Sequence, residues 1–141
     1  MTLVIDSNVL VSLLVFDDPR YRAIQAAWRA GRLRVVTDAA CAAEFRRVLA
    51  YPQLGLDGAR QSAIYGEFLA AVALREGAAT GAVRPGLPRC ADEDDQKFLE
   101  LAAACSADLL VTGDRELLKL ARRVPFSIVT ADELERNVRS W

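Results

Sequence analysis

Histidine is absent from the sequence, and this absence narrows the possible chemistry of the chain more than any other feature. Without an imidazole, Ser-His-Asp and Cys-His catalysis are excluded. Metal sites built on histidine are excluded for the same reason. If the chain is an enzyme, we therefore expect carboxylates to do the chemical work.

Cysteine is scarce as well. The three cysteines are Cys41, Cys90 and Cys105, and no two of them have CxxC spacing. An odd number of cysteines without CxxC spacing fits neither a disulfide framework nor a structural zinc site. We expect free thiols that are mostly buried in the core.

Long apolar runs are also missing. The apolar stretch at residues 68–74 is far shorter than the roughly 20 residues that a membrane-spanning helix needs. Asp6 interrupts the first apolar run and no basic leader precedes it, so the start of the chain does not resemble a secretory signal. These absences predict a cytoplasmic protein without a membrane segment.

The composition that is present indicates one α/β domain. The chain has 141 residues, of which 52% are hydrophobic, and this is enough to build a core around one sheet. We therefore expect residues 1–141 to form a single domain. Strand patterns alternate with helical patterns along the chain, which predicts a mostly parallel sheet with helices on both faces.

The expected strands are residues 3–5, 33–37, 109–112 and 126–129. The expected helices are residues 7–14, 21–30, 39–50, 56–76, a helix from the acidic run at 92–95 to about 106, residues 114–122, and a last helix after 130. Ser7 or Asn8 is the expected N-cap of the first helix, Asp38 of the third, and Thr130 or Asp132 of the last. Residues 77–89 contain three glycines and two prolines, which predicts a loop with room for a short strand at 82–84.

Two aspartates stand where an expected strand gives way to a helix. These are Asp6, after the first strand, and Asp114, after the strand at 109–112. Ligands of parallel sheets bind at the carboxyl ends of the strands, so both carboxylates are expected on the same edge. Helix capping explains either residue taken alone, and only their convergence points to function.

Further acids join this pair. Glu44 lies in an alanine-rich helix, where it faces either the solvent or a polar pocket. Asp92, Glu93, Asp94 and Asp95 form a run that exceeds what capping a helix requires. Within the run we select Asp95, because the apolar residues Phe98, Leu99 and Ala102 follow it at helical spacing and place it at the inward end of their stripe.

Carboxylates crowded at one edge repel each other unless a cation lies between them. A hard divalent cation such as Mg²⁺ prefers oxygen ligands and completes its shell with water and phosphate. Arg20, Arg22, Arg46 and Arg47 belong to an arginine-rich stretch and are candidates for binding the phosphate groups of a ligand. A solvated surface explains these arginines equally well.

Taken together, three segments resemble a known family. VIDSNVL at residues 4–10, DEDDQKFLELA at 92–102 and LVTGDRELL at 110–118, with Glu44 between the first two, are similar to PIN-domain proteins. The resemblance covers nearly the whole chain in order, and is greatest to the VapC-like group of toxins from toxin-antitoxin systems. Residues 52–88 carry no matching motif.

The resemblance implies a three-layer α/β/α sandwich with Mg²⁺- or Mn²⁺-dependent endoribonuclease activity. It also implies a cognate antitoxin and, commonly, a homodimer, for which Trp28 and the face with Tyr65 and Phe68 offer apolar area. By position, the catalytic and metal-binding residues would be Asp6, Glu44, Asp95 and Asp114. Asn8, Thr112 and Asp92 would support them, while Ser7 stands where threonine is more usual and keeps the hydroxyl.

Three other functions remain open. One is a PIN-like domain that binds RNA or a partner without cutting, and another is a housekeeping PIN nuclease without an antitoxin. A phosphotransferase-type hydrolase would also begin with an aspartate after the first strand. Such enzymes generally carry a second aspartate two residues on, where this chain has Asn8, and their phosphate-binding lysine would have to be Lys97 or Lys119.

Overall fold

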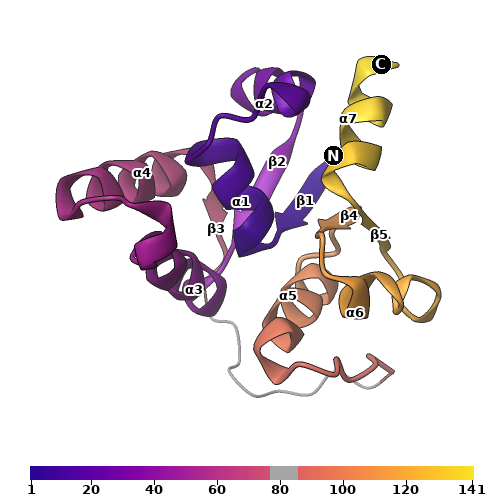
Figure 1. Ribbon diagram of the computed structural model, residues 1–141. Coiled ribbons are helices and arrows are strands. Elements are labelled where there is room, and N and C mark those ends of the chain that lie inside the picture. Colours follow the sequence, from indigo (N-terminus) through magenta and orange to yellow (C-terminus); the bar gives the residue numbers. More distant parts are fainter. Residues whose placement is uncertain (77–85) are drawn as a thin grey trace.

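A parallel sheet of five strands forms the centre of the computed structural model, which describes residues 1–76 and 86–141 (Figure 1). The strands are β1 (Thr2–Ile5), β2 (Arg34–Thr37), β3 (Ala73–Leu74), β4 (Leu109–Val111) and β5 (Ser127–Val129). Their order across the sheet is β3-β2-β1-β4-β5, and all four pairings are parallel. The chain therefore winds outward from β1 in both directions, and the carboxyl ends of β1 and β4 meet where the direction changes. In sheets of this kind, that point is where ligands bind.

Helices cover both faces of the sheet. They are α1 (Ser7–Leu14), α2 (Arg22–Arg29), α3 (Ala39–Leu49), α4 (Gly58–Ala71), α5 (Glu93–Ala104), α6 (Arg115–Leu118) and α7 (Ala131–Arg139), with short 3₁₀ turns at Pro19–Tyr21, Pro52–Leu54 and Ala121–Arg123. In Figure 1, α5 and α6 lie together, apart from α1, α2 and α4. The expected three-layer α/β/α sandwich is confirmed.

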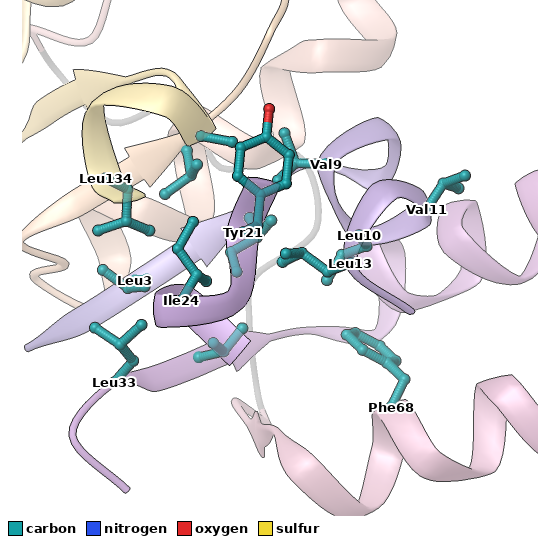
Figure 2. Close-up of a cluster of buried hydrophobic side chains, with 14 of the residues drawn as sticks. Leu3, Val9, Leu10, Val11, Leu13, Tyr21, Ile24, Leu33, Phe68 and Leu134 are labelled. Atoms are coloured by element: carbon teal, nitrogen blue, oxygen red, sulfur yellow. The ribbon is translucent and has the colours of Figure 1, made fainter. Parts of the chain in front are cut away.

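Successive side chains along a β-strand point to opposite faces of the sheet. Leu3 and Ile5 of β1 join a core with α1, α2, α3, α4 and α7, whereas Val4 joins a second core with α5 and α6. Figure 2 shows the first core, where β1, α1, α2, α4 and α7 contribute Leu3, Leu10, Ile24, Phe68 and Leu134. Burial on both faces explains why the strands read as continuous apolar runs.

A buried carboxylate on α7, near the end of the chain, forms hydrogen bonds to α2. Glu135 of α7 is 5% exposed and accepts hydrogen bonds from the backbone N–H groups of Ala23 (3.3 Å) and Ile24 (3.0 Å) in the first turn of α2. Arg139 donates to the same carboxylate at 2.7 Å. Tyr21, the N-cap residue of α2, makes no side-chain hydrogen bond to the helix. Glu135, which is 111 residues beyond Ile24 in the sequence, therefore caps the helix instead.

The sequence placed most elements correctly, and three expectations were wrong. The helix expected to continue to residue 76 ends at Ala71, because the next residues pair with β2 through Val36–Ala73 and Thr37–Leu74. The first helix is capped by Asp6 instead of Ser7 or Asn8. The helix expected at 114–122 breaks after Leu118 into a separate 3₁₀ turn.

Several other expectations for local structure are confirmed. Asp38 caps α3, and Thr130 opens α7 in a capping box with Glu133. The three cysteines are free, with Cys41 and Cys90 buried. The short strand expected at 82–84 lies outside the described residues. No helix within the described ranges is long and apolar enough to cross a membrane.

Candidate active site

Asp6 is a buried carboxylate at the carboxyl end of the central strand β1. Its side chain is 6% exposed, accepts a hydrogen bond from the Val9 backbone N–H at 2.9 Å, and caps α1. It also accepts a hydrogen bond from the hydroxyl of Thr112. Burial raises the pKa of Asp6, the bonds from Thr112 and Val9 oppose this effect, and the nearby charge of Glu44 adds to it. The site therefore holds Asp6 firmly in a fixed orientation.

Thr112 connects Asp6 to Asp114. This threonine follows β4 and is fully buried. Its hydroxyl donates to Asp6 and accepts from the backbone N–H of Asp114 at 3.0 Å. Asp114 in turn caps α6 by accepting from the Glu116 N–H at 2.8 Å. One hydroxyl thus sets the positions of two aspartates that are 108 residues apart in sequence.

Asp95 of α5 lies against Asp114. Burial raises the pKa of Asp95 to about 7, with further contributions from a hydrogen bond and charge repulsion with Asp114 and from the charges of Asp92 and Glu44. One oxygen of Asp95, Oδ2, is buried and has no hydrogen-bond partner in the described part of the chain. Two carboxylates in contact repel each other when both are ionised, and a shared proton or a cation between them relieves this repulsion.

The other acids of the run point elsewhere. Asp94 is exposed, as the direction of the apolar stripe of α5 predicted. Asp92 is the N-cap of α5 and accepts from the Asp94 N–H at 2.9 Å. The charge of Asp92 also helps to raise the pKa of Asp95, so Asp92 adds to the negative charge near the site.

Glu44 of α3 already has partners for both of its oxygens. Its Oε1 lies 2.9 Å from the ammonium Nζ of Lys97, and its Oε2 accepts from the hydroxyl of Ser7 at 2.5 Å. The side chains of Glu44 and Lys97 are only 17% and 19% exposed. The charge of Glu44 helps to raise the pKa values of Asp6 and Asp95, so this glutamate lies near both of these carboxylates.

Ser7 and Lys97 contact Glu44 in the candidate site, and the sequence did not assign them to it. The only signal for Ser7 was the hydroxyl that it retains next to Asp6. Lys97 was considered only as a phosphate-binding lysine of another enzyme class. Its pairing with Glu44 depends on α3 packing against α5, which no local pattern indicates.

The remaining predicted residues lie outside this cluster. Asn8 is exposed on α1, and its side chain has no hydrogen bond within the described residues. Arg20 pairs with Asp18 at 2.8 Å, and Arg22 lies 3.6 Å from Asp17. The guanidinium of Arg46 lies 5.3 Å from the centre of the Tyr65 ring, and Arg47 is exposed. Among the described residues, no ion pair joins these four arginines to the site carboxylates.

We asked whether these residues fit a divalent cation. In the described part of the chain, no group of three or more histidine, cysteine or acidic side chains is arranged to hold a metal ion. Mg²⁺ nevertheless often binds through one or two carboxylates and keeps several waters. The close pair of Asp95 and Asp114, with the unpartnered Oδ2 of Asp95, fits a hydrated cation of this kind.

Comparison with known proteins places this geometry in context. The family model described as PIN domain matches residues 2–116. No curated protein matches the chain significantly in sequence. The solved structures that share its fold include the following two. The first is VapBC2 from Rickettsia felis bound to a DNA fragment from its promoter, with a TM-score of 0.63, 14% identity, and coverage of 92% of this chain and 98% of that one. The second is PAE2754 from Pyrobaculum aerophilum, with a TM-score of 0.63, 18% identity, and coverage of 100% of this chain and 97% of that one. The match of the family model to most of the chain shows that this protein belongs to the PIN domain family.

Proposed function

We propose that the chain is a divalent-metal-dependent endoribonuclease in which residues 1–141 form one PIN-like nuclease domain. PIN-domain proteins are typically nucleases, which supports hydrolysis of a phosphodiester. The observation that carries the proposal is the close pair of Asp95 and Asp114, joined through Thr112 to the buried Asp6. This cluster lies at the carboxyl ends of β1 and β4, where parallel sheets bind their ligands.

In this proposal Asp95 and Asp114 hold Mg²⁺ or Mn²⁺, and Asp6 and Glu44 complete the acidic site. When bound, such a cation lowers the pKa of a water molecule and neutralises charge on the phosphate under attack. The protein's own contribution is positional. Thr112 fixes Asp6 and Asp114 through one hydroxyl, and the first turn of α5 holds the half-buried Asp95 near Asp114 while Asp94 stays exposed to solvent.

We further propose that the protein is the toxin of a toxin-antitoxin pair and acts in the cytoplasm. The similarity in fold to VapBC2 of Rickettsia felis supports an antitoxin partner. Free cysteines are typical of a reducing compartment. A homodimer is also proposed, but Phe68 offers no surface for it because this residue is buried in the core, and Trp28 and Tyr65 are partly buried against the same core.

The experiment is RNA cleavage by the purified protein with Mg²⁺ or Mn²⁺. Asp6→Asn and Asp114→Asn should each abolish cleavage while leaving the fold intact by circular dichroism. Asp94→Asn removes the same charge from the exposed side of α5 and should retain most of the activity. It is therefore the matched control.

Two results would contradict the proposal. Equal cleavage in excess EDTA would rule out the metal-dependent mechanism. Loss of cleavage in Asp94→Asn with retention in Asp95→Asn would show that the assignment of the acids on α5 is wrong.

One observation favours a second function, which is RNA or partner binding without cleavage. Glu44 is occupied by Lys97 and Ser7, and within the described residues no three acidic side chains converge on a metal position. The same assay distinguishes the two. A protein of this second kind would bind RNA in a gel-shift measurement and leave it intact at every Mg²⁺ and Mn²⁺ concentration.

A further inference from the structure

Lys97 places a positive charge inside the acidic site, and neither capping nor surface solvation accounts for it. The chain has two lysines, Lys97 and Lys119. The ammonium of Lys119 pairs with Glu116 at the surface, and its side chain is 68% exposed. The side chain of Lys97 is 19% exposed, and its ammonium lies 2.9 Å from Oε1 of Glu44.

The surroundings of Lys97 hold its ammonium in place. It donates a hydrogen bond to the backbone carbonyl of Asp94 and lies 5.3 Å from the centre of the Phe98 ring. Its carbonyl accepts from the thiol of Cys41 on α3 at 3.8 Å. The Glu44–Lys97 pair thus bridges α3 and α5 over a packed contact between the two helices.

Glu44 is the carboxylate that Lys97 neutralises, and it also influences the other acids. The charge of Glu44 reaches Asp6 and Asp95, so any change in the pairing of Glu44 changes the field at the proposed cation position. A carboxylate oxygen engaged by an ammonium at 2.9 Å is less available to a metal ion. Lys97 and a divalent cation are therefore alternative counter-ions for one glutamate.

We propose that Lys97 is a positioning residue that acts as an internal counter-cation, competes with the divalent cation for Glu44, and so sets the metal affinity of the site. This inference rests on the proposed metal-dependent function. The ion pair with Lys97 engages Oε1 of Glu44 and compensates one negative charge of the cluster. When the cation binds, it must draw Glu44 from the ammonium, and the loss of that ion pair weakens the observed affinity.

The test is direct titration of the RNA-free protein with Mn²⁺, followed by the electron paramagnetic resonance signal of the free ion. Lys97→Met should bind Mn²⁺ more tightly, on the order of tenfold, because a competing unit charge is removed from a partly buried site. Lys97→Arg keeps the charge and should stay near the wild-type affinity. Lys119→Met makes the same substitution at the exposed lysine and should leave the affinity unchanged.

A double-mutant cycle separates competition for Glu44 from simple repulsion through space. In a Glu44→Gln background, Lys97→Met should increase the affinity clearly less than it does in the wild type. Equal increases in both backgrounds would overturn the competition. So would an unchanged or weaker affinity in Lys97→Met protein that is folded by circular dichroism. Should that variant not fold, Lys97→Gln serves for the same comparison because it keeps a polar end group.

The inference and the proposed function fail in different ways. If Asp95→Asn combined with Asp114→Asn leaves Mn²⁺ binding intact, the proposed cation site itself is wrong. If that pair of substitutions removes Mn²⁺ binding but Lys97→Met does not tighten it, the site stands and only the role of Lys97 is refuted.

Discussion

Replacement of Asp95 by asparagine is expected to make the metal-free protein more stable at neutral and alkaline pH. The pKa of Asp95 is raised from 3.8 to about 7, first by burial and then by its contact with Asp114. The folded state therefore binds this proton more tightly than the unfolded state does. In the wild type, ionisation of Asp95 therefore lowers the free energy of unfolding as the pH rises from about 4 to about 7. Above that pH the loss is complete.

The size of the effect follows from the shift. One pKa unit corresponds to about 1.4 kcal/mol, so the whole shift sets an upper limit of about 4 kcal/mol. Asp95 remains partly open to solvent, which screens its interactions and lowers the expectation to about 1–2 kcal/mol. For a domain of this size, that difference raises the Tm by about 3–6 °C.

Thermal unfolding followed by circular dichroism in EDTA provides the measurement. Asp95→Asn should exceed the wild type in Tm at pH 8, and the gap should shrink toward zero as the pH falls to 4. Addition of Mn²⁺ should also narrow the gap, because the cation stabilises only the intact carboxylate pair. Asp94→Asn is the matched control and should not change the Tm in this way. A variant that is no more stable than the wild type at pH 8, or a gap independent of pH, would refute the repulsion between Asp95 and Asp114.

Two further predictions concern regions outside the carboxylate cluster. Arg47→Ala should weaken RNA binding and reduce the salt dependence of binding by about one phosphate contact. Arg46→Ala should weaken binding less, because the guanidinium of Arg46 lies over the ring of Tyr65. An unchanged salt slope in both variants would assign these arginines to the solvated surface. Glu135→Gln should lower the free energy of unfolding by about 1–3 kcal/mol, since it weakens hydrogen bonds to the start of α2 and to Arg139. Chemical denaturation checks this, with the exposed Glu116→Gln as control, and equal stability of the two variants would contradict the buried cap.

The sequence could indicate candidate acids because strand ends and helix faces are local properties. Asp6 and Asp114 follow apolar strands, and parallel strands bring their carboxyl ends to one edge. The choice of Asp95 over Asp94 rested on the spacing to Ala102 and on the direction of the apolar stripe of α5, and the exposure of Asp94 agrees with it. Local periodicity also identified most of the helices and strands.

Long-range contacts decided what the sequence could not show. Residues 73–74 have a helical pattern but form β3, because backbone pairing with β2 outweighs local preference. The first turn of α2 depends on Glu135, which is supplied by the opposite end of the chain. The partner of Glu44 is an ammonium on another helix, and only the packing of α3 against α5 brings the two together. Local sequence patterns therefore indicate which acids follow the strand ends, whereas the folded arrangement is needed to know which charges are paired, because pairing depends on distances between side chains that are far apart along the chain.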